Sequence, residues 1–159
     1  SFMEWSYIVS SWKEKDVFYS ADIYKPALTC MNLTNSWCVE KIDYLVEQLP
    51  EVHFYIVAHT FMSDELKRLS RFQNVTLYPN SFPILVEKLL KSSDIYLDLN
   101  LDEKLVYVYD LVKKCEKPIL TFDNTRCLTI PEESYAGICH HDRPDEMVEM
   151  IKSFMEGES

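Results

Sequence analysis

Glycine is almost missing from this chain: two occur in 159 residues, Gly137 and Gly157. The G-x-G-x-x-G dinucleotide fingerprint and the P-loop both need closely spaced glycines, so neither phosphate cradle can be present. A bound phosphate would have to be held by helix N-termini, hydroxyl groups or charged side chains.

The chain also lacks long apolar runs and an excess of positive charge. No run approaches the ~18 apolar residues of a membrane span. The first residues, Ser-Phe-Met, do not form the basic start of a signal peptide, so we expect no secretory leader and a cytoplasmic location. Sixteen Lys and Arg face 26 Asp and Glu, a net charge of −10. This charge argues against nonspecific binding to nucleic acid or to an anionic membrane surface.

A disulfide framework is not indicated either. The number of cysteines is odd and no C-x-x-C occurs. They are Cys30, Cys38, Cys115, Cys127 and Cys139. We expect them to be free thiols in a reducing compartment.

The chain contains five short apolar runs. Each run ends at a few polar residues, here called a corner, and is followed by a stretch in which apolar residues recur at helical spacing. The runs cover residues 26–32, 52–60, 75–78, 95–100 and 119–122. The helical stretches cover residues 36–48, 63–71, 83–91, 102–115 and 144–155. With a last strand at 136–139, this alternation predicts an α/β fold, a Rossmann-like three-layer sandwich around a mainly parallel sheet of about six strands.

The two ends of the chain give further expectations. Residues 1–25 do not follow the repeating unit and are rich in aromatics, so we expect a linker or a segment that packs on a preceding domain. Residues 26–159 should form one domain. Asp142 is expected to cap the last helix, with Pro144 in its first turn.

In parallel sheets, ligands bind beyond the carboxyl ends of the strands, so the corners are the candidate site. The candidate binding residues of the first three corners are Thr34, Asn35, Ser36, Thr60, Met62, Ser63, Tyr78 and Asn80. Each also has a purely structural interpretation. Ser36 and Ser63 would serve equally well as helix caps, and Tyr78 as a buried aromatic at a strand end.

The corners, taken in order, resemble a known family. The segments are LTNS at 33–36, LPEVHFYIVA at 49–58, TFMS at 60–63, NVTLYPN at 74–80 and DIYLDLN at 94–100. Their order and spacing are similar to the C-terminal half of the bacterial glycosyltransferases that modify serine-rich repeat adhesins. That group includes the two-subunit transferase of the accessory secretion system. The resemblance covers roughly residues 26–125.

This resemblance implies the GT-B architecture, in which two Rossmann-like domains enclose the active site. The chain would be the half that binds a nucleotide-sugar, UDP-linked, for transfer of a hexose to a serine- and threonine-rich adhesin or its glycan. Such enzymes need no metal cofactor. A missing N-terminal domain or a partner subunit would complete the active site. The isolated chain should therefore not catalyse sugar transfer.

The resemblance also implies roles for residues on the fourth helix. Retaining enzymes of this fold often carry Glu-x7-Glu there, and this chain has Asp102 and Asp110 at the same spacing. Asp102, or its neighbour Glu103, would face the donor sugar, and Asp110 would accept the ribose hydroxyls. Both aspartates are shorter than the glutamates of that pattern, by about one C–C bond. Arg126 and Lys104 are the nearest cations for the diphosphate.

The sequence also permits other interpretations. The chain could be a noncatalytic module of the same system that binds a partner subunit or the acceptor, which the few cations and short acids favour. A signalling receiver domain is disfavoured, because Met31 and Tyr78 stand where such domains need acidic residues. Metal sites at Asp98 with Asp102, or at 140–142 (HHD), are not expected. The histidine pair with Asp142 could bind a metal, but no third site stands out. His53 and His59 should be structural.

Overall fold

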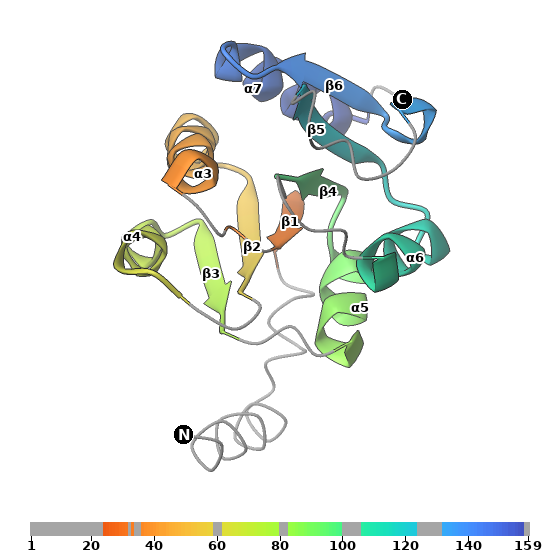
Figure 1. The fold of residues 1–159 in the computed structure, drawn as a ribbon, viewed down its shortest axis with the longest axis horizontal. Coiled ribbons are helices and arrows are strands. Elements are labelled where there is room, and N and C mark those ends of the chain that lie inside the picture. The colour runs from red at the N-terminus through yellow and green to blue at the C-terminus, as the bar shows by residue number, and fades with distance from the viewer. Residues whose placement is uncertain are drawn as a thin grey trace.

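The computed structural model describes residues 24–31, 33, 36–58, 62–79, 83–99, 106–123 and 132–157, with only the backbone of 106, 107 and 132. Six strands form one sheet in the order β3-β2-β1-β4-β5-β6, with every neighbouring pair parallel (Figure 1). They are β1 Ala27–Met31, β2 His53–Val57, β3 Val75–Tyr78, β4 Ile95–Asp98, β5 Ile119–Asp123 and β6 Gly137–His140. The predicted α/β class and six-stranded parallel sheet are confirmed. Most of the segment expected at 1–25 lies outside the described residues.

The helices also begin and end close to the predicted residues. They are α3 Ser36–Gln48, α4 Asp64–Lys67 with the 3₁₀ turn η1 Arg68–Arg71, α5 Pro83–Ser92, α6 Val106–Lys114, the 3₁₀ turn η2 Glu132–Ser134, and α7 Pro144–Met155. The second predicted helix is thus only partly α-helical, because its last turn tightens to 3₁₀ geometry. Among the helices described, none has the length and apolar character needed to cross a membrane.

The expected cap of the last helix is wrong. Arg143, not Asp142, occupies the N-cap position of α7, and no side chain caps the helix there. Pro144 follows at the first helical position, where its missing N–H leaves one donor fewer to satisfy. Arg143 instead forms two hydrogen bonds, of 3.1 and 3.0 Å, to the carboxylate of Asp145 in the first turn.

The sheet separates two hydrophobic cores. Leu28 and Cys30 of β1 enter the core beneath α3, α4 and α7, whereas Ala27 and Met31 enter the core beneath α5 and α6 (Figure 1). Because strand side chains alternate between faces and both faces are covered, the central strands are apolar at nearly every position. This explains why the sequence shows continuous apolar runs rather than an alternating pattern.

The cysteines that the structure describes are free thiols, as expected. Cys30 is fully buried in β1, and burial raises the pKa of its thiol well above the usual range. A thiol that stays protonated is a poor nucleophile, so Cys30 is a core residue and not a reactive one.

His53, at the start of β2, is structural, as the sequence predicted. Its side chain is 6% exposed, and its Nε2 lies 2.7 Å from the hydroxyl of Thr76 on β3. The ring stacks on Tyr24, with 3.7 Å between ring centroids. Burial lowers the pKa of His53 to about 4, so the neutral ring is the form that the fold accepts.

This burial predicts loss of stability in acid. The unfolded histidine takes up its proton near pH ~6.5, but the folded one does so only near pH 4. The contribution of neutral His53 is therefore fully present above pH ~6.5 and falls by about 3 kcal/mol as the pH drops from 7 to 4. A His53→Gln variant, which cannot titrate, should lose less unfolding free energy over that range in urea titrations. Equal losses in the two proteins would contradict the assignment.

Candidate functional site

The strand order reverses between β1 and β4, and α3 begins at that point. In open α/β sheets this switch point is where ligands bind. The Cys38 thiol donates a 3.0 Å hydrogen bond to the carbonyl of Leu99. The ring of Trp37 packs edge-on against the ring of Phe122, with 5.9 Å between the ring centroids. The first turn of α3 is thus fixed over the ends of β4 and β5. It carries no acidic residue, so nothing in that turn offsets the positive end of the helix dipole.

The described residues of the first two corners lie at helix starts. Ser36 is the exposed first residue of α3. Ser63 caps α4, because its hydroxyl accepts a 3.1 Å hydrogen bond from the backbone N–H of Leu66, which confirms the capping interpretation. Met62 packs against the core beneath α3. The other candidates of these corners, Thr34, Asn35 and Thr60, lie outside the described residues.

The third corner ends in a buried aromatic. Tyr78 is 3% exposed, and its ring belongs to the core beneath α5 and α6, 6.3 Å from the ring of Tyr55. In this conformation the ring is not available to stack on a nucleotide base, as the structural interpretation predicted. Asn80 lies outside the described residues.

The carboxylates assigned by resemblance are only partly described. Asp110 is exposed on α6, one residue after Tyr109, which turns toward the sheet. Asp102, Glu103 and Arg126 lie outside the described residues, as does Lys104. Their catalytic and diphosphate-binding roles therefore stay predictions.

Asp98, at the end of β4, is a buried anchor that sequence analysis did not identify. It is 1% exposed, and one oxygen, Oδ2, accepts hydrogen bonds from the hydroxyls of Tyr109 at 2.7 Å and Tyr135 at 2.9 Å. The hydroxyl of Thr121 donates to the Asp98 backbone carbonyl at 2.7 Å. Asp98 thus ties α6, β5 and the segment before β6 to the carboxyl end of β4. The signal for it was an acidic residue inside the apolar run at 95–100.

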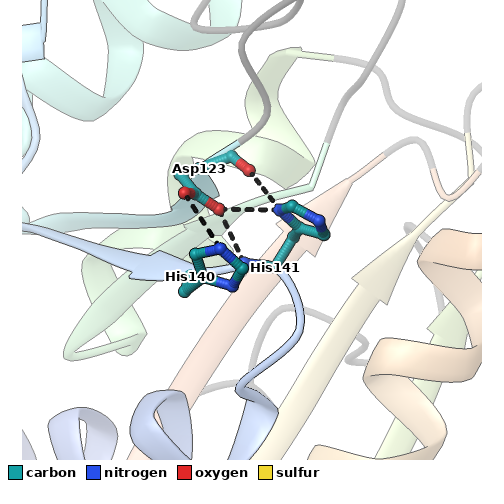
Figure 2. Close-up of side chains that lie close together, drawn as sticks. All are labelled: Asp123, His140 and His141. Carbon is teal, nitrogen blue, oxygen red and sulfur yellow. Dashed lines mark hydrogen bonds and ion pairs between the residues drawn. The ribbon is translucent and has the colours of Figure 1, made fainter.

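A second cluster lies where β5 and β6 end (Figure 2). Asp123 and His140 are register partners, so parallel pairing of the two strands brings them together. The backbone N–H of His141 donates to Asp123 Oδ1 at 2.6 Å, which holds the pKa of that carboxyl below its usual range. The side-chain hydrogen bond between His141 Nδ1 and the same oxygen, at 3.0 Å, raises the pKa of His141. Sequence analysis considered His140 and His141 only together with Asp142 and did not connect them with Asp123.

Lys41 supplies a cation near this edge that sequence analysis missed. Its ammonium group donates a 2.7 Å hydrogen bond to the carbonyl of His141 and lies 5.2 Å from the centroid of the Trp37 ring. Lys41 stands in the second turn of α3 rather than in a corner, and only the tertiary fold brings it beside β6.

The chain is similar to known streptococcal proteins along almost its whole length. Residues 30–159 match the GftB/GlyA-F C-terminal domain. Over 155 residues the chain is 54% identical to glycosyltransferase GlyE of Streptococcus pneumoniae serotype 4, which is 98% of this chain but 38% of GlyE. It is also 34% identical to GtfB of Streptococcus parasanguinis, a protein named as stabilizing a UDP-N-acetylglucosamine–peptide N-acetylglucosaminyltransferase; this match covers 75% of the chain and 27% of GtfB.

Solved structures give the same result. The crystal structure of GlyE from Streptococcus pneumoniae TIGR4 superposes with a TM-score of 0.74 and 50% identity, over 95% of this chain and 38% of that one. The GtfA/B complex bound to UDP and GlcNAc superposes with a TM-score of 0.65 at 24% identity, over 86% of this chain and 31% of that one, which shows the shared fold. The sequence-based resemblance and the GT-B class of the fold are both confirmed. The chain spans well under half the length of these relatives.

Proposed function

The chain belongs to the GftB/GlyA-F C-terminal domain family, and from this membership we propose that it is the nucleotide-sugar-binding half of a glycosyltransferase. The observation that carries the proposal is the 54% identity to GlyE over 98% of the chain. The other half of the active site comes from a further domain of the same polypeptide or from a partner subunit, since GlyE extends well beyond the region matched here.

The proposed donor is a UDP-linked sugar bound at the switch point between β1 and β4. The first turn of α3 supports this, because its backbone N–H groups and its uncompensated positive end suit a diphosphate. The complex of GtfA and GtfB, which shares this fold, was solved with UDP and GlcNAc. Thr34, Asn35 and Ser36 are proposed to hold the diphosphate, with Arg126 as its counter-charge.

The catalytic residues are proposed to lie on the fourth helix and in the segment just before it. Asp102, with Glu103 beside it, would face the donor sugar and stabilise the positive charge that develops on its ring. Asp110 would accept the ribose hydroxyls, and its exposure on α6 leaves it accessible for that bond. The remaining proposed contacts to the nucleotide come from Thr60, Met62, Ser63 and Asn80, and from the backbone of Tyr78, because the Tyr78 ring is buried. No metal is proposed for the transfer itself, because helix amides and cations can neutralise the diphosphate.

The proposed acceptor is a serine- and threonine-rich adhesin or its first sugars, modified in the cytoplasm. The family membership supports the acceptor class, and the free thiols support a reducing compartment.

A second function is favoured by the 34% identity to GtfB, which is named as a stabilizing protein. In that case the chain would be a noncatalytic module that holds a catalytic subunit or the acceptor. The net charge of −10 fits this alternative, since a diphosphate needs positive charge around it.

One assay separates the two functions. The full-length protein is incubated with UDP-glucose, UDP-galactose or UDP-N-acetylglucosamine and an acceptor peptide rich in serine, and UDP release and peptide mass are followed. A catalytic donor half gives acceptor-dependent release from one of the sugars. A stabilizing module gives no release from any donor alone, but raises transfer when a catalytic subunit is added.

A further inference from the structure

We infer that Asp123, His140 and His141 form a binding site for a divalent transition metal ion, with zinc as the ion that fits the ligands. One ligand atom from each side chain lies within 4.8 Å of the other two (Figure 2). Two imidazole nitrogens and one carboxylate oxygen are a common zinc ligand set. Magnesium and calcium prefer sites built from oxygen alone, so they fit less well.

The distances between the ligand atoms are close to those of a filled site. His141 Nδ1 lies 3.0 Å from Asp123 Oδ1, and His140 Nε2 lies 4.0 Å from Asp123 Oδ2. Zinc bonds of ~2.0–2.1 Å in tetrahedral geometry separate the ligand atoms by about 3.3 Å. Filling the site therefore means bringing His140 Nε2 closer to the carboxylate while His141 Nδ1 moves slightly away from it. The imidazole rings are stacked with 4.5 Å between their centroids, so one of them has to tilt before both ring nitrogens face one ion.

Groups around the ligands support the site. The His141 backbone N–H fixes the Asp123 carboxylate, and Asp142 Oδ1 lies 3.5 Å from His141 Nε2. A carboxylate on the far nitrogen of a metal-bound histidine orients the ring and makes it a better ligand. His140 Nδ1 accepts the Asp142 N–H at 3.1 Å, so an ion at Nε2 would move the ring proton to Nδ1. Water can then take over that exposed amide.

The site is open to solvent, since the three side chains are between 42% and 51% exposed. Three protein ligands leave a fourth position for water. A bound ion would join the ends of β5 and β6 just before α7, and would bring positive charge to an acidic chain. This role is separate from donor binding, and its test does not depend on whether the chain binds a nucleotide.

The test is calorimetric titration of the 159-residue chain with zinc chloride. We expect one ion per chain with a dissociation constant in the micromolar range. Asp123→Asn, His140→Ala and His141→Ala should each weaken binding at least about tenfold, and Asp142→Asn by less. Glu149→Gln is the matched control, because it removes one exposed carboxylate from α7 and should leave the affinity unchanged. Circular dichroism verifies that each variant is folded.

Cobalt replaces zinc in a second measurement that excludes the thiols. Histidine and carboxylate ligands give cobalt weak visible bands without the intense near-ultraviolet charge transfer of thiolate ligands. Stoichiometric binding with such a spectrum, abolished in His141→Ala, supports the site. Three results would each overturn it. They are no saturable zinc binding, an affinity in the three ligand variants equal to that of the unmodified chain, or thiolate bands in the cobalt spectrum.

Discussion

Replacing Asp98 with alanine is expected to lower the free energy of unfolding by about 3–5 kcal/mol. The buried carboxylate accepts the hydroxyls of Tyr109 and Tyr135 through one oxygen, and hydrogen bonds to a charged group contribute ~1.5–3 kcal/mol each. Alanine removes the acceptor and leaves both hydroxyls at a site with very little solvent. Urea titration followed by circular dichroism measures the loss.

Two sets of variants show whether the hydrogen bonds are the cause. Asp98→Asn keeps an acceptor oxygen and nearly the same shape, so its loss should be clearly smaller than that of alanine. In a background that carries both Tyr109→Phe and Tyr135→Phe, Asp98→Ala should cost much less than in the parent chain, because these two donors are already gone. If the alanine substitution costs the same in both backgrounds, the tyrosine contacts are not what makes Asp98 important.

Replacing Asp102 with alanine in the full-length protein is expected to reduce transferase turnover by about 10²–10⁴-fold. The proposed role of this carboxylate is to stabilise charge that exists only in the transition state. Its removal should therefore lower kcat while leaving KM for the donor nearly unchanged. Initial rates of UDP release over a range of donor concentrations separate the two parameters.

Two matched variants separate charge, reach and donor binding. Asp102→Glu restores the longer acid of the family pattern that this chain resembles, and it should keep activity or raise it. Asp110→Asn removes a bond proposed to be made to the ribose in both ground and transition states, so it should raise KM by about tenfold and change kcat little. Full activity in Asp102→Ala would remove the catalytic role from this residue and leave Glu103 as the candidate.

The fold was predictable from the sequence because both faces of the sheet are covered. Burial on two sides makes each strand a continuous apolar run, and the helices between them keep a regular stripe, as in α3. The exact residue at a helix end was harder to predict from the sequence. Backbone geometry put Arg143 rather than Asp142 at the N-cap of α7, and composition alone does not determine which of two adjacent residues takes that position.

The site was harder to predict because its contacts join residues that are distant in sequence. Asp98 meets Tyr135 across 37 positions, and Lys41 reaches His141 across 100. The corners lie at the carboxyl edge of the sheet, but they could not show that the Tyr78 ring turns into the core. The pairing of Asp123 with His140 follows only once β5 and β6 are known to be neighbours.

The most direct test of the donor-binding account is calorimetric titration of this chain with UDP, with and without EDTA. The account predicts saturable one-to-one binding in the micromolar to millimolar range that EDTA does not change, because helix amides and side chains, not a metal, hold the diphosphate. No heat of binding with UDP, UDP-glucose or UDP-N-acetylglucosamine would contradict it, and would favour a stabilizing module that binds a partner subunit or the acceptor.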